Sequence, residues 1–122
     1  MWIPPSGPPV SLSLPTFLDK NFVGRDPLKE SVVACNANET VRLLQLRDPI
    51  AAHTHNDQDE IVYIVAGDGA VRVDRLTTAL APGSLMVIPH GFSHAFERRG
   101  RNPLVILSTL SGPCRSTADA PR

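Results

Sequence analysis

Three histidines and one glutamate are the residues of this chain whose types and spacing could do chemistry. His53 and His55 are one residue apart, so on a β-strand, where successive side chains alternate between two faces, they point to the same side. Glu60 follows five residues later, and His94 lies much further along the chain. Neutral imidazoles with one carboxylate suit a divalent ion of Fe, Mn, Ni, Co or Zn, and four such ligands leave room for a substrate on a six-coordinate ion. We therefore predict a site for one divalent transition metal, without choosing among these elements.

The position of Glu60 requires a break in the strand that holds the two histidines. Glu60 lies an odd number of residues from His55, so on an uninterrupted strand its side chain would point to the opposite face. The four residues between them, 56–59, have the sequence Asn-Asp-Gln-Asp, which is typical of a turn. We expect the strand to end there, so that the Glu60 side chain can point to the same side as the two imidazoles. The alternative is a set of unrelated polar residues in a surface loop.

Short apolar runs around this site predict strands. They are rich in β-branched and long apolar residues, and turn-forming pairs such as Asp68-Gly69 and Pro82-Gly83 separate them. Asp68-Gly69 also favours a hairpin between the two runs that flank it. Many short strands at close spacing favour a sandwich or a barrel. The predicted strands are 40–47, 60–66, 70–75, 84–88 and 103–110.

The two ends of the chain differ from its strand-rich middle. Residues 1–15 contain five prolines, which disfavour a regular helix and predict an extended arm. Residues 111–122 have the composition of a flexible tail. The folded domain is therefore expected to span residues 16–110, with a short helix at 16–21.

The predicted strand 60–66 is apolar on both faces. Val62 and Ile64 share one face, while Ile61 and Tyr63 belong to the other. A strand of this kind is usually buried on both sides. In so small a domain the second face must meet the N-terminal arm or another subunit, so we predict a homodimer.

Composition excludes several classes of partner. The chain has 122 residues, enough for one domain, and its 12 basic residues balance 12 acidic ones, which argues against binding of nucleic acid or an anionic membrane surface. No apolar stretch approaches the roughly 18 residues of a membrane span, and the N-terminus lacks the features of a signal peptide.

Two cysteines, Cys35 and Cys114, do not make a disulfide framework, and we expect Cys114 to be a free thiol. We predict a cytoplasmic location as the default for a chain with these features.

The spacing of the four candidate ligands, taken with the glycines and the proline around them, resembles the cupin superfamily. The two cupin motifs can be written G-x5-H-x-H-x4-E-x6-G and G-x5-P-x-G-x2-H-x3-N. The chain departs from them at two positions, with Arg47 in place of the leading glycine and Arg98 in place of the closing asparagine. The matching residues are His53, His55, Glu60, Gly67, Gly83, Pro89, Gly91 and His94.

The resemblance implies an all-β fold, an antiparallel jelly-roll β-barrel with one metal inside. It also implies that the metal ligands are His53, His55, Glu60 and His94. His90, at an unconstrained position of the second motif, is expected to be exposed and to bind no metal. The family includes dioxygenases, sugar-phosphate isomerases, lyases, cyclases and non-catalytic binders, so membership leaves the reaction open.

The function predicted from these features is that of a small mononuclear metalloenzyme of oxygenase type. Its substrate would be a small oxygenated organic molecule, because a metal with open positions can bind and polarise such a ligand or activate dioxygen. A sugar-phosphate isomerase or lyase is one alternative, and an isomerase needs cationic groups near the pocket, for which Arg42, Arg72 and Arg98 are candidates. A non-catalytic module that binds a metal or a small ligand is the other alternative. No second constellation of acid, base or nucleophile stands out in the sequence.

Overall fold

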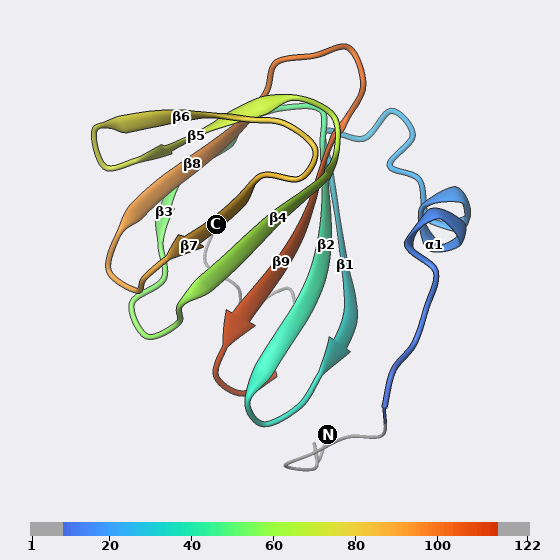
Figure 1. Ribbon diagram of the computed structural model, residues 1–122, viewed down its shortest axis with the longest axis horizontal. Coiled ribbons are helices and arrows are strands. Elements are labelled where there is room, and N and C mark those ends of the chain that lie inside the picture. Colours follow the sequence, from blue (N-terminus) through green and yellow to red (C-terminus); the bar gives the residue numbers. More distant parts are fainter. Residues whose placement is uncertain (1–8, 115–122) are drawn as a thin grey trace.

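The structure of the protein is a computed structural model that describes residues 9–114 (Figure 1). The predictions for the first part of the arm and for most of the tail, residues 1–8 and 115–122, lie outside the described residues. The described elements are α1 (Leu14–Lys20), β1 (Leu28–Cys35), β2 (Glu39–Leu46), β3 (Ile50–Thr54), β4 (Glu60–Ala66), β5 (Gly69–Val73), β6 (Leu76–Leu80), β7 (Leu85–Ile88), β8 (Ser93–Arg98) and β9 (Leu104–Ser111).

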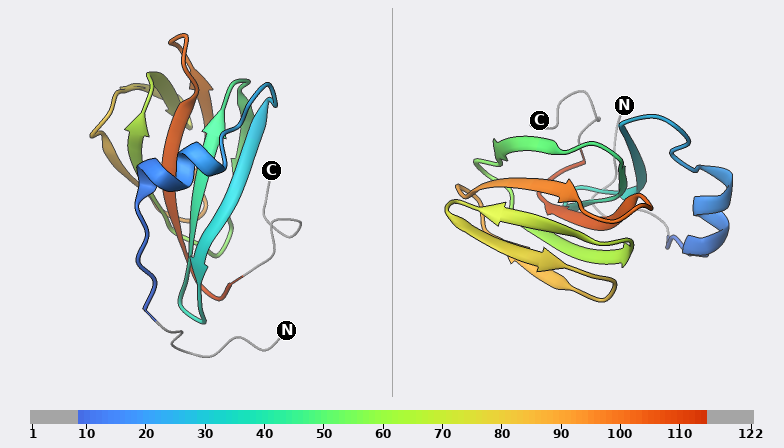
Figure 2. Two further views of the ribbon diagram at one scale, coloured as in Figure 1. Left: turned by 90° about the vertical axis from the view of Figure 1, so that its right-hand side faces the viewer. Right: turned by 90° about the horizontal axis from the view of Figure 1, so that it is seen from above.

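Two antiparallel sheets face each other and enclose the core (Figures 1 and 2). The larger sheet has the strand order β1-β2-β9-β4-β7, and the smaller one has the order β3-β8-β5-β6. Buried side chains from both sheets form one cluster, which includes Leu44, Ile64 and Ile106 from the larger sheet and Val71 and Phe96 from the smaller. This arrangement confirms the predicted all-β fold, an antiparallel jelly-roll barrel.

Five predicted strands are present as β2, β4, β5, β7 and β9, with their ends shifted by at most two residues. Strand β3 corresponds to the strand expected around His53, and strands β1, β6 and β8 are not predicted by the sequence pattern. Strands β1 and β6 lie at sheet edges and keep most side chains half-buried or exposed, so no clear alternation marks them. Strand β8 is not apparent from the sequence for another reason. Most of the residues around its buried Phe96 are polar or charged, so the segment is not an apolar run.

The predicted hairpin at Asp68-Gly69 is wrong. Strand β4 pairs with β7 and β9, whereas β5 pairs with β6 and β8, so this turn carries the chain from one sheet to the other. Gly67 begins the crossing with φ 82°, and a Cβ there would lie 2.3 Å from the carbonyl oxygen of Pro103. The tight hairpin joins β5 to β6 instead, at Asp74, whose φ is 52°. Packing of the turn against the other sheet, rather than its own residues, decides the pairing.

Helix α1 begins at Leu14, two residues before the predicted start. Ser13 is the N-cap, and its side chain accepts a hydrogen bond from the backbone N–H of Thr16 at 3.4 Å. Pro15 lies in the first turn, where the missing N–H would have no helical partner in any case. Leu14 and Pro15 thus belong to the helix rather than to the extended arm.

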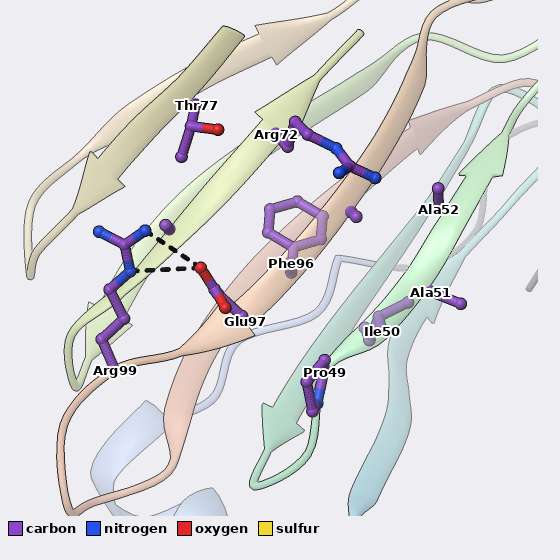
Figure 3. A pocket seen from close by; sticks show the side chains of 11 residues that line it. Pro49, Ile50, Ala51, Ala52, Arg72, Thr77, Phe96, Glu97 and Arg99 are labelled. Atoms are coloured by element: carbon purple, nitrogen blue, oxygen red, sulfur yellow. Dashed lines mark hydrogen bonds and ion pairs between the residues drawn. The ribbon is translucent and has the colours of Figure 1, made fainter. Parts of the chain in front are cut away.

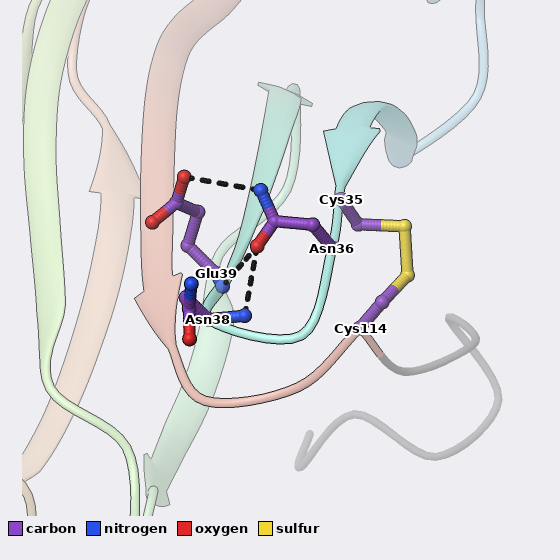
Figure 4. The surroundings of a disulfide bond; sticks show 5 residues. All are labelled: Cys35, Asn36, Asn38, Glu39 and Cys114. Carbon is purple, nitrogen blue, oxygen red and sulfur yellow. Dashed lines mark hydrogen bonds between the residues drawn. A yellow bond between two sulfur atoms is a disulfide. The ribbon is translucent and has the colours of Figure 1, made fainter. Parts of the chain in front are cut away.

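Cys35 and Cys114 form a disulfide bond, so the prediction of a free thiol at Cys114 is wrong (Figure 4). The segment after β9 runs beside the end of β1, and the backbone N–H of Cys114 donates to the carbonyl of Asn36 at 2.7 Å. The Asn36 side chain in turn accepts from the backbone N–H groups of Asn38 and Glu39, which shapes the turn between β1 and β2. A separation of 79 residues hides this proximity from the sequence.

N-terminal residues within the described range cover the outer face of the larger sheet at β1, β2 and β9 but not at β4 and β7. Gln45 on β2 donates to the carbonyl of Asn21 and accepts from the backbone N–H of Val23, which fixes the end of α1 against the sheet (Figure 2, left). Val10 and Leu12 line a pocket together with residues of β1, β2 and β9. Strands β4 and β7 lie at the other side of the sheet.

There, four large apolar residues are exposed on β4 and β7, and we call them the β4–β7 outer face. Ile61 pairs with Val87 and Tyr63 with Leu85 in the register of the two strands. Their relative exposures are 46% for Ile61, 43% for Tyr63, 67% for Leu85 and 60% for Val87. The inward face of β4 is buried as predicted, and the outward face is left open in the single chain. Within residues 9–114 the structure has no helix of the length and hydrophobicity that a bilayer crossing requires.

Candidate metal centre

The structure brings His53, His55, Glu60 and His94 together. Each offers a ligand atom, and all four atoms lie within 4.8 Å of one another. Glu60 Oε1 is 3.0 Å from His94 Nε2 and 3.6 Å from His55 Nε2. Two ligand atoms that sit about 2.1 Å from one ion, at angles between about 90° and 110°, would be roughly 3.0–3.4 Å apart. The two distances from Glu60 Oε1 are close to this range, which is compatible with a site for one ion.

Both sheets contribute to the cluster. His53 on β3 lies directly opposite His94 on β8 in the register of that strand pair, and His55 follows the end of β3. Glu60 is the first residue of β4 in the other sheet. The predicted strand break is confirmed, because β3 ends at Thr54 and β4 begins at Glu60. The cluster thus spans the space between the sheets.

The cluster is buried, and within the described part of the chain four of its polar atoms have no hydrogen-bond partner. His55, Glu60 and His94 are 1–2% exposed, whereas His53 is half-buried. Among the described residues, five buried side-chain polar atoms have no hydrogen-bond partner, and four of them belong to this cluster. They are Nδ1 and Nε2 of His55, Oε1 of Glu60 and Nε2 of His94. Buried polar atoms are nearly always paired, so this concentration of unpaired atoms fits a site built to surround an ion.

Two backbone carbonyls orient the imidazoles. His53 Nδ1 lies 3.0 Å from the carbonyl oxygen of Ala51, and His94 Nδ1 lies 3.1 Å from that of Phe92. A carbonyl only accepts, so each Nδ1 carries the proton and each Nε2 keeps its lone pair. Hydrogen bonds of this kind fix the tautomer and the ring direction of metal-binding histidines.

Hydrogen bonds from two neighbouring side chains hold one oxygen of the Glu60 carboxylate. Its Oε2 accepts hydrogen bonds from Arg42 Nη2 at 3.1 Å and from Ser108 Oγ at 2.6 Å, while Oε1 faces the imidazoles. Burial by itself raises the pKa of the Glu60 carboxyl. The imidazoles of His55 and His94 outweigh this effect, together with the two groups that hold Oε2, and keep the pKa well below its usual range. Glu60 is therefore ionised, as a metal ligand must be.

The histidines differ in their affinity for a proton. Burial lowers the pKa of His53, which favours the neutral, metal-binding form. Burial also acts to lower the pKa of His94, but the adjacent Glu60 carboxylate outweighs it and raises that pKa above the ordinary value. A divalent ion would therefore compete with a proton at His94, since only the unprotonated imidazole nitrogen binds metal.

His90, Asp59 and Phe96 lie near the cluster but are not part of it. The His90 side chain is exposed, as expected, and its Nδ1 lies 2.9 Å from Asp59 Oδ1. The backbone N–H and the imidazole of His90 lower the pKa of Asp59. Phe96 is buried in the core, with its ring centroid 5.9 Å from that of His94.

The three candidate arginines are placed differently from one another. Arg42 contacts Glu60 behind the cluster. Arg98 donates to the backbone carbonyls of Arg47 and Arg101. Arg72 is exposed and lines a groove on the smaller sheet, together with side chains that include Thr77 and the Glu97–Arg99 ion pair (Figure 3).

Ser108 is the contributing residue that sequence reasoning missed. It lies on β9 between the buried, inward-facing Ile106 and Leu110, and it is itself completely buried. A hydroxyl in the middle of an otherwise apolar inward row is a signal that could have marked it, because buried polar groups need partners.

Comparisons with known proteins agree with this architecture. A curated relative, an uncharacterized protein SCO3923 from Streptomyces coelicolor, is 36% identical over 56 residues, which are 46% of this chain and 52% of that protein. The chain thus matches only about half the length of this relative. BH2720 from Bacillus halodurans has a similar structure, with a TM-score of 0.77 at 15% identity over 94% of this chain and 89% of that one.

A predicted oxalate decarboxylase from Thermotoga maritima is also similar in structure, with a TM-score of 0.65 at 20% identity over 70% of this chain and 80% of that one. At such low identities the solved structures support the fold alone. The family model described as the Cupin domain matches residues 42–110, a segment that holds all four clustered residues and more than half of the chain. The chain therefore belongs to the cupin family.

Proposed function

We propose that this protein is a mononuclear metalloenzyme of oxygenase type that acts on a small oxygenated organic molecule. The observation that supports this proposal most strongly is the group of unpaired, buried ligand atoms contributed by His55, Glu60 and His94 beside His53. A divalent ion at this site would polarise a substrate oxygen, and a redox-active one would supply dioxygen chemistry. His53 is half-buried and is the most accessible of the four residues, so we propose that a small molecule approaches from its side.

Apart from Arg42 and Ser108, which contact Glu60, several residues near the cluster are apolar. Ile88 pairs with Glu60 and Met86 with Val62 across β7 and β4, and Phe96 packs beside His94. Apolar walls exclude bulk water, which strengthens electrostatic interactions inside a site and protects reactive species from side reactions. They contribute no acid or base, so the chemistry would depend on the metal and its ligands.

The sugar-phosphate isomerase alternative lacks this kind of support. An isomerase for phosphorylated sugars needs a cationic side chain free to bind the phosphate. All three nitrogens of the Arg42 guanidinium have partners, in Ser108, Glu30 and Glu60. Arg98 is engaged with backbone carbonyls, and Arg72 lies on the outer side of β5, where it alternates with the buried Val71.

A lyase that acts on a small carboxylate is the second candidate. We include it because the predicted oxalate decarboxylase of Thermotoga maritima shares this fold. The same cluster would then bind the oxygen atoms of a small anion, and the reaction would release carbon dioxide without net consumption of dioxygen. The two candidates therefore differ in a quantity that can be measured.

Anaerobic loading with Fe(II) tests the proposal. We expect nitric oxide to bind the loaded protein and give a half-integer-spin EPR signal, because four protein ligands leave positions open on a six-coordinate ion. We also expect oxygen uptake with at least one compound from a panel of small catechols, diketones and thiols. Release of carbon dioxide from oxalate by the Mn(II)-loaded protein would favour the lyase. Tight metal binding without turnover in either assay would contradict an enzymatic role and leave the binding-module alternative.

We also propose that the protein forms a homodimer through the β4–β7 outer face. Exposed apolar side chains gathered on two adjacent strands are typical of an interaction surface. In size-exclusion chromatography with light scattering we expect twice the chain mass of 13.2 kDa. Leu85→Asp should give the monomer. Leu76→Asp, an equally exposed leucine on the smaller sheet, is the matched control and should leave the dimer intact. A wild-type mass of one chain would contradict the proposal.

A cytoplasmic location stays a prediction. The Cys35–Cys114 disulfide counts against it, because such bonds persist mainly in oxidising compartments.

A further inference from the structure

We infer that Arg42 and Ser108 are positioning residues that make Glu60 a metal ligand through one oxygen only. The inference rests on the metal site proposed above, but not on the reaction performed there. It concerns how many positions on the ion the protein leaves open, which decides whether a ligand with two oxygen donors can bind.

The two oxygens of the Glu60 carboxylate have different surroundings. Oε2 accepts from Arg42 Nη2 at 3.1 Å and from Ser108 Oγ at 2.6 Å, whereas Oε1 has no hydrogen-bond partner and lies 3.0 Å from His94 Nε2. Arg42 is 6% exposed and Ser108 is completely buried, so water does not compete for these contacts. Hydrogen bonds in which the donor or the acceptor is ionised are among the strongest in proteins.

The donors themselves are fixed in place. Arg42 and Ser108 are cross-strand partners on β2 and β9, and Ser108 lies opposite Val62 on β4, two residues beyond Glu60. Arg42 Nε lies 3.2 Å from Ser108 Oγ, and Nη1 contacts Glu30 at 2.5 Å. The guanidinium therefore reaches three partners at once from a single orientation. A lysine ammonium, which is a compact point charge, cannot reproduce that fork.

A consequence for coordination follows. To bind an ion through both oxygens, the carboxylate would have to turn Oε2 away from two buried donors and leave them unpaired, which is costly. Glu60 thus stays a one-oxygen ligand. Three imidazoles and one carboxylate oxygen would then fill four positions of a six-coordinate ion and leave two for an external ligand. The same contacts would restrain the Glu60 side chain, which disfavours a role as a mobile base.

Cobalt substitution tests the inference with two charge-conserving variants. We expect Ser108→Ala and Arg42→Lys, loaded with Co(II), to show a weaker and shifted visible absorption than the wild type, because Oε2 with one of its two donors removed or misplaced can turn toward the ion as an added ligand. Azide, a small anion that reports open positions on Co(II), should bind at least about tenfold more weakly to both variants, the smallest effect common for residues that orient a metal ligand. Loss of Co(II) uptake by either variant with an unchanged circular dichroism spectrum would support the positioning role as well.

Matched controls separate this effect from general damage. Thr109→Ala changes the next hydroxyl on β9, and Arg72→Lys changes an exposed arginine in the same way; both should keep the wild-type spectrum and azide affinity. Ser108→Ala decides the question if Arg42→Lys does not fold. Wild-type spectra and azide affinities in the two test variants would overturn this inference alone. Failure of the wild-type protein to take up Co(II), Fe(II) or Mn(II) would overturn the proposed metal site together with it.

Discussion

Replacing His94 or His53 by alanine is expected to remove most of the bound metal, whereas His90→Ala should leave the metal content unchanged. His94 and His53 each place a ring nitrogen in the cluster, with the other nitrogen held at a backbone carbonyl. Loss of a residue that merely orients a ligand costs about 10- to 100-fold in metal affinity, and loss of the ligand itself should cost at least as much. His90 is exposed and bound to Asp59 outside the cluster.

Elemental analysis of each purified variant after loading and dialysis measures this effect. His53→Ala is the more informative of the two ligand variants, because His53 is half-buried and its loss should leave the fold intact, whereas His94 is 1% exposed. Circular dichroism checks that each variant is folded. A folded His53→Ala protein with one full equivalent of metal would remove His53 from the ligand set. Loss of metal from His90→Ala would show that ions bind outside the cluster.

Removing the Cys35–Cys114 bond is expected to lower the free energy of unfolding by about 4 kcal/mol. The bond closes a loop with a sequence separation of 79 residues, and cross-links of long loops restrict the unfolded chain most. For a domain of this size such a loss corresponds to a fall in Tm of roughly 12–16 °C. The bond also anchors the segment that follows β9. Ser111, the last residue of β9, exchanges hydrogen bonds with Gln58 and Asp59, which directly precede Glu60.

Thermal unfolding with and without a reductant, followed by circular dichroism, measures the contribution of the disulfide. The double variant Cys35→Ser/Cys114→Ser is the control, because its Tm should match that of the reduced wild type and should not respond to the reductant. Equal Tm values for oxidised and reduced wild-type protein would show that the cross-link adds no stability.

Local patterns in the sequence were sufficient for much of the fold. Strands such as β4 and β9 are short runs of β-branched and long apolar residues that end at turn-forming residues, so the local sequence alone predicts them. The break between His55 and Glu60 was predicted from parity and turn-forming residues, and the structure has it. The four candidate ligands could also be selected from their spacing, and the structure gathers them; their binding of a metal stays a prediction.

Contacts between distant segments could not be predicted in the same way. Asp68-Gly69 is a good hairpin turn by its residues, but packing of Gly67 against the Pro103 backbone sends the chain into the other sheet. The edge strands β1 and β6 lack a clear alternation because only part of each is buried.

The sequence by itself determined the fold class, most of the strands and the candidate ligands, because each depends on residues close together in the chain or on a spaced motif. Only the tertiary structure decided that Cys35 meets Cys114, and that Ser108 and Arg42 hold one oxygen of Glu60 and leave the other facing the imidazoles. Pairs such as Arg42 and Ser108, 66 residues apart, become neighbours only when two strands align in register. Register depends on the packing of the whole barrel, so no local pattern records it.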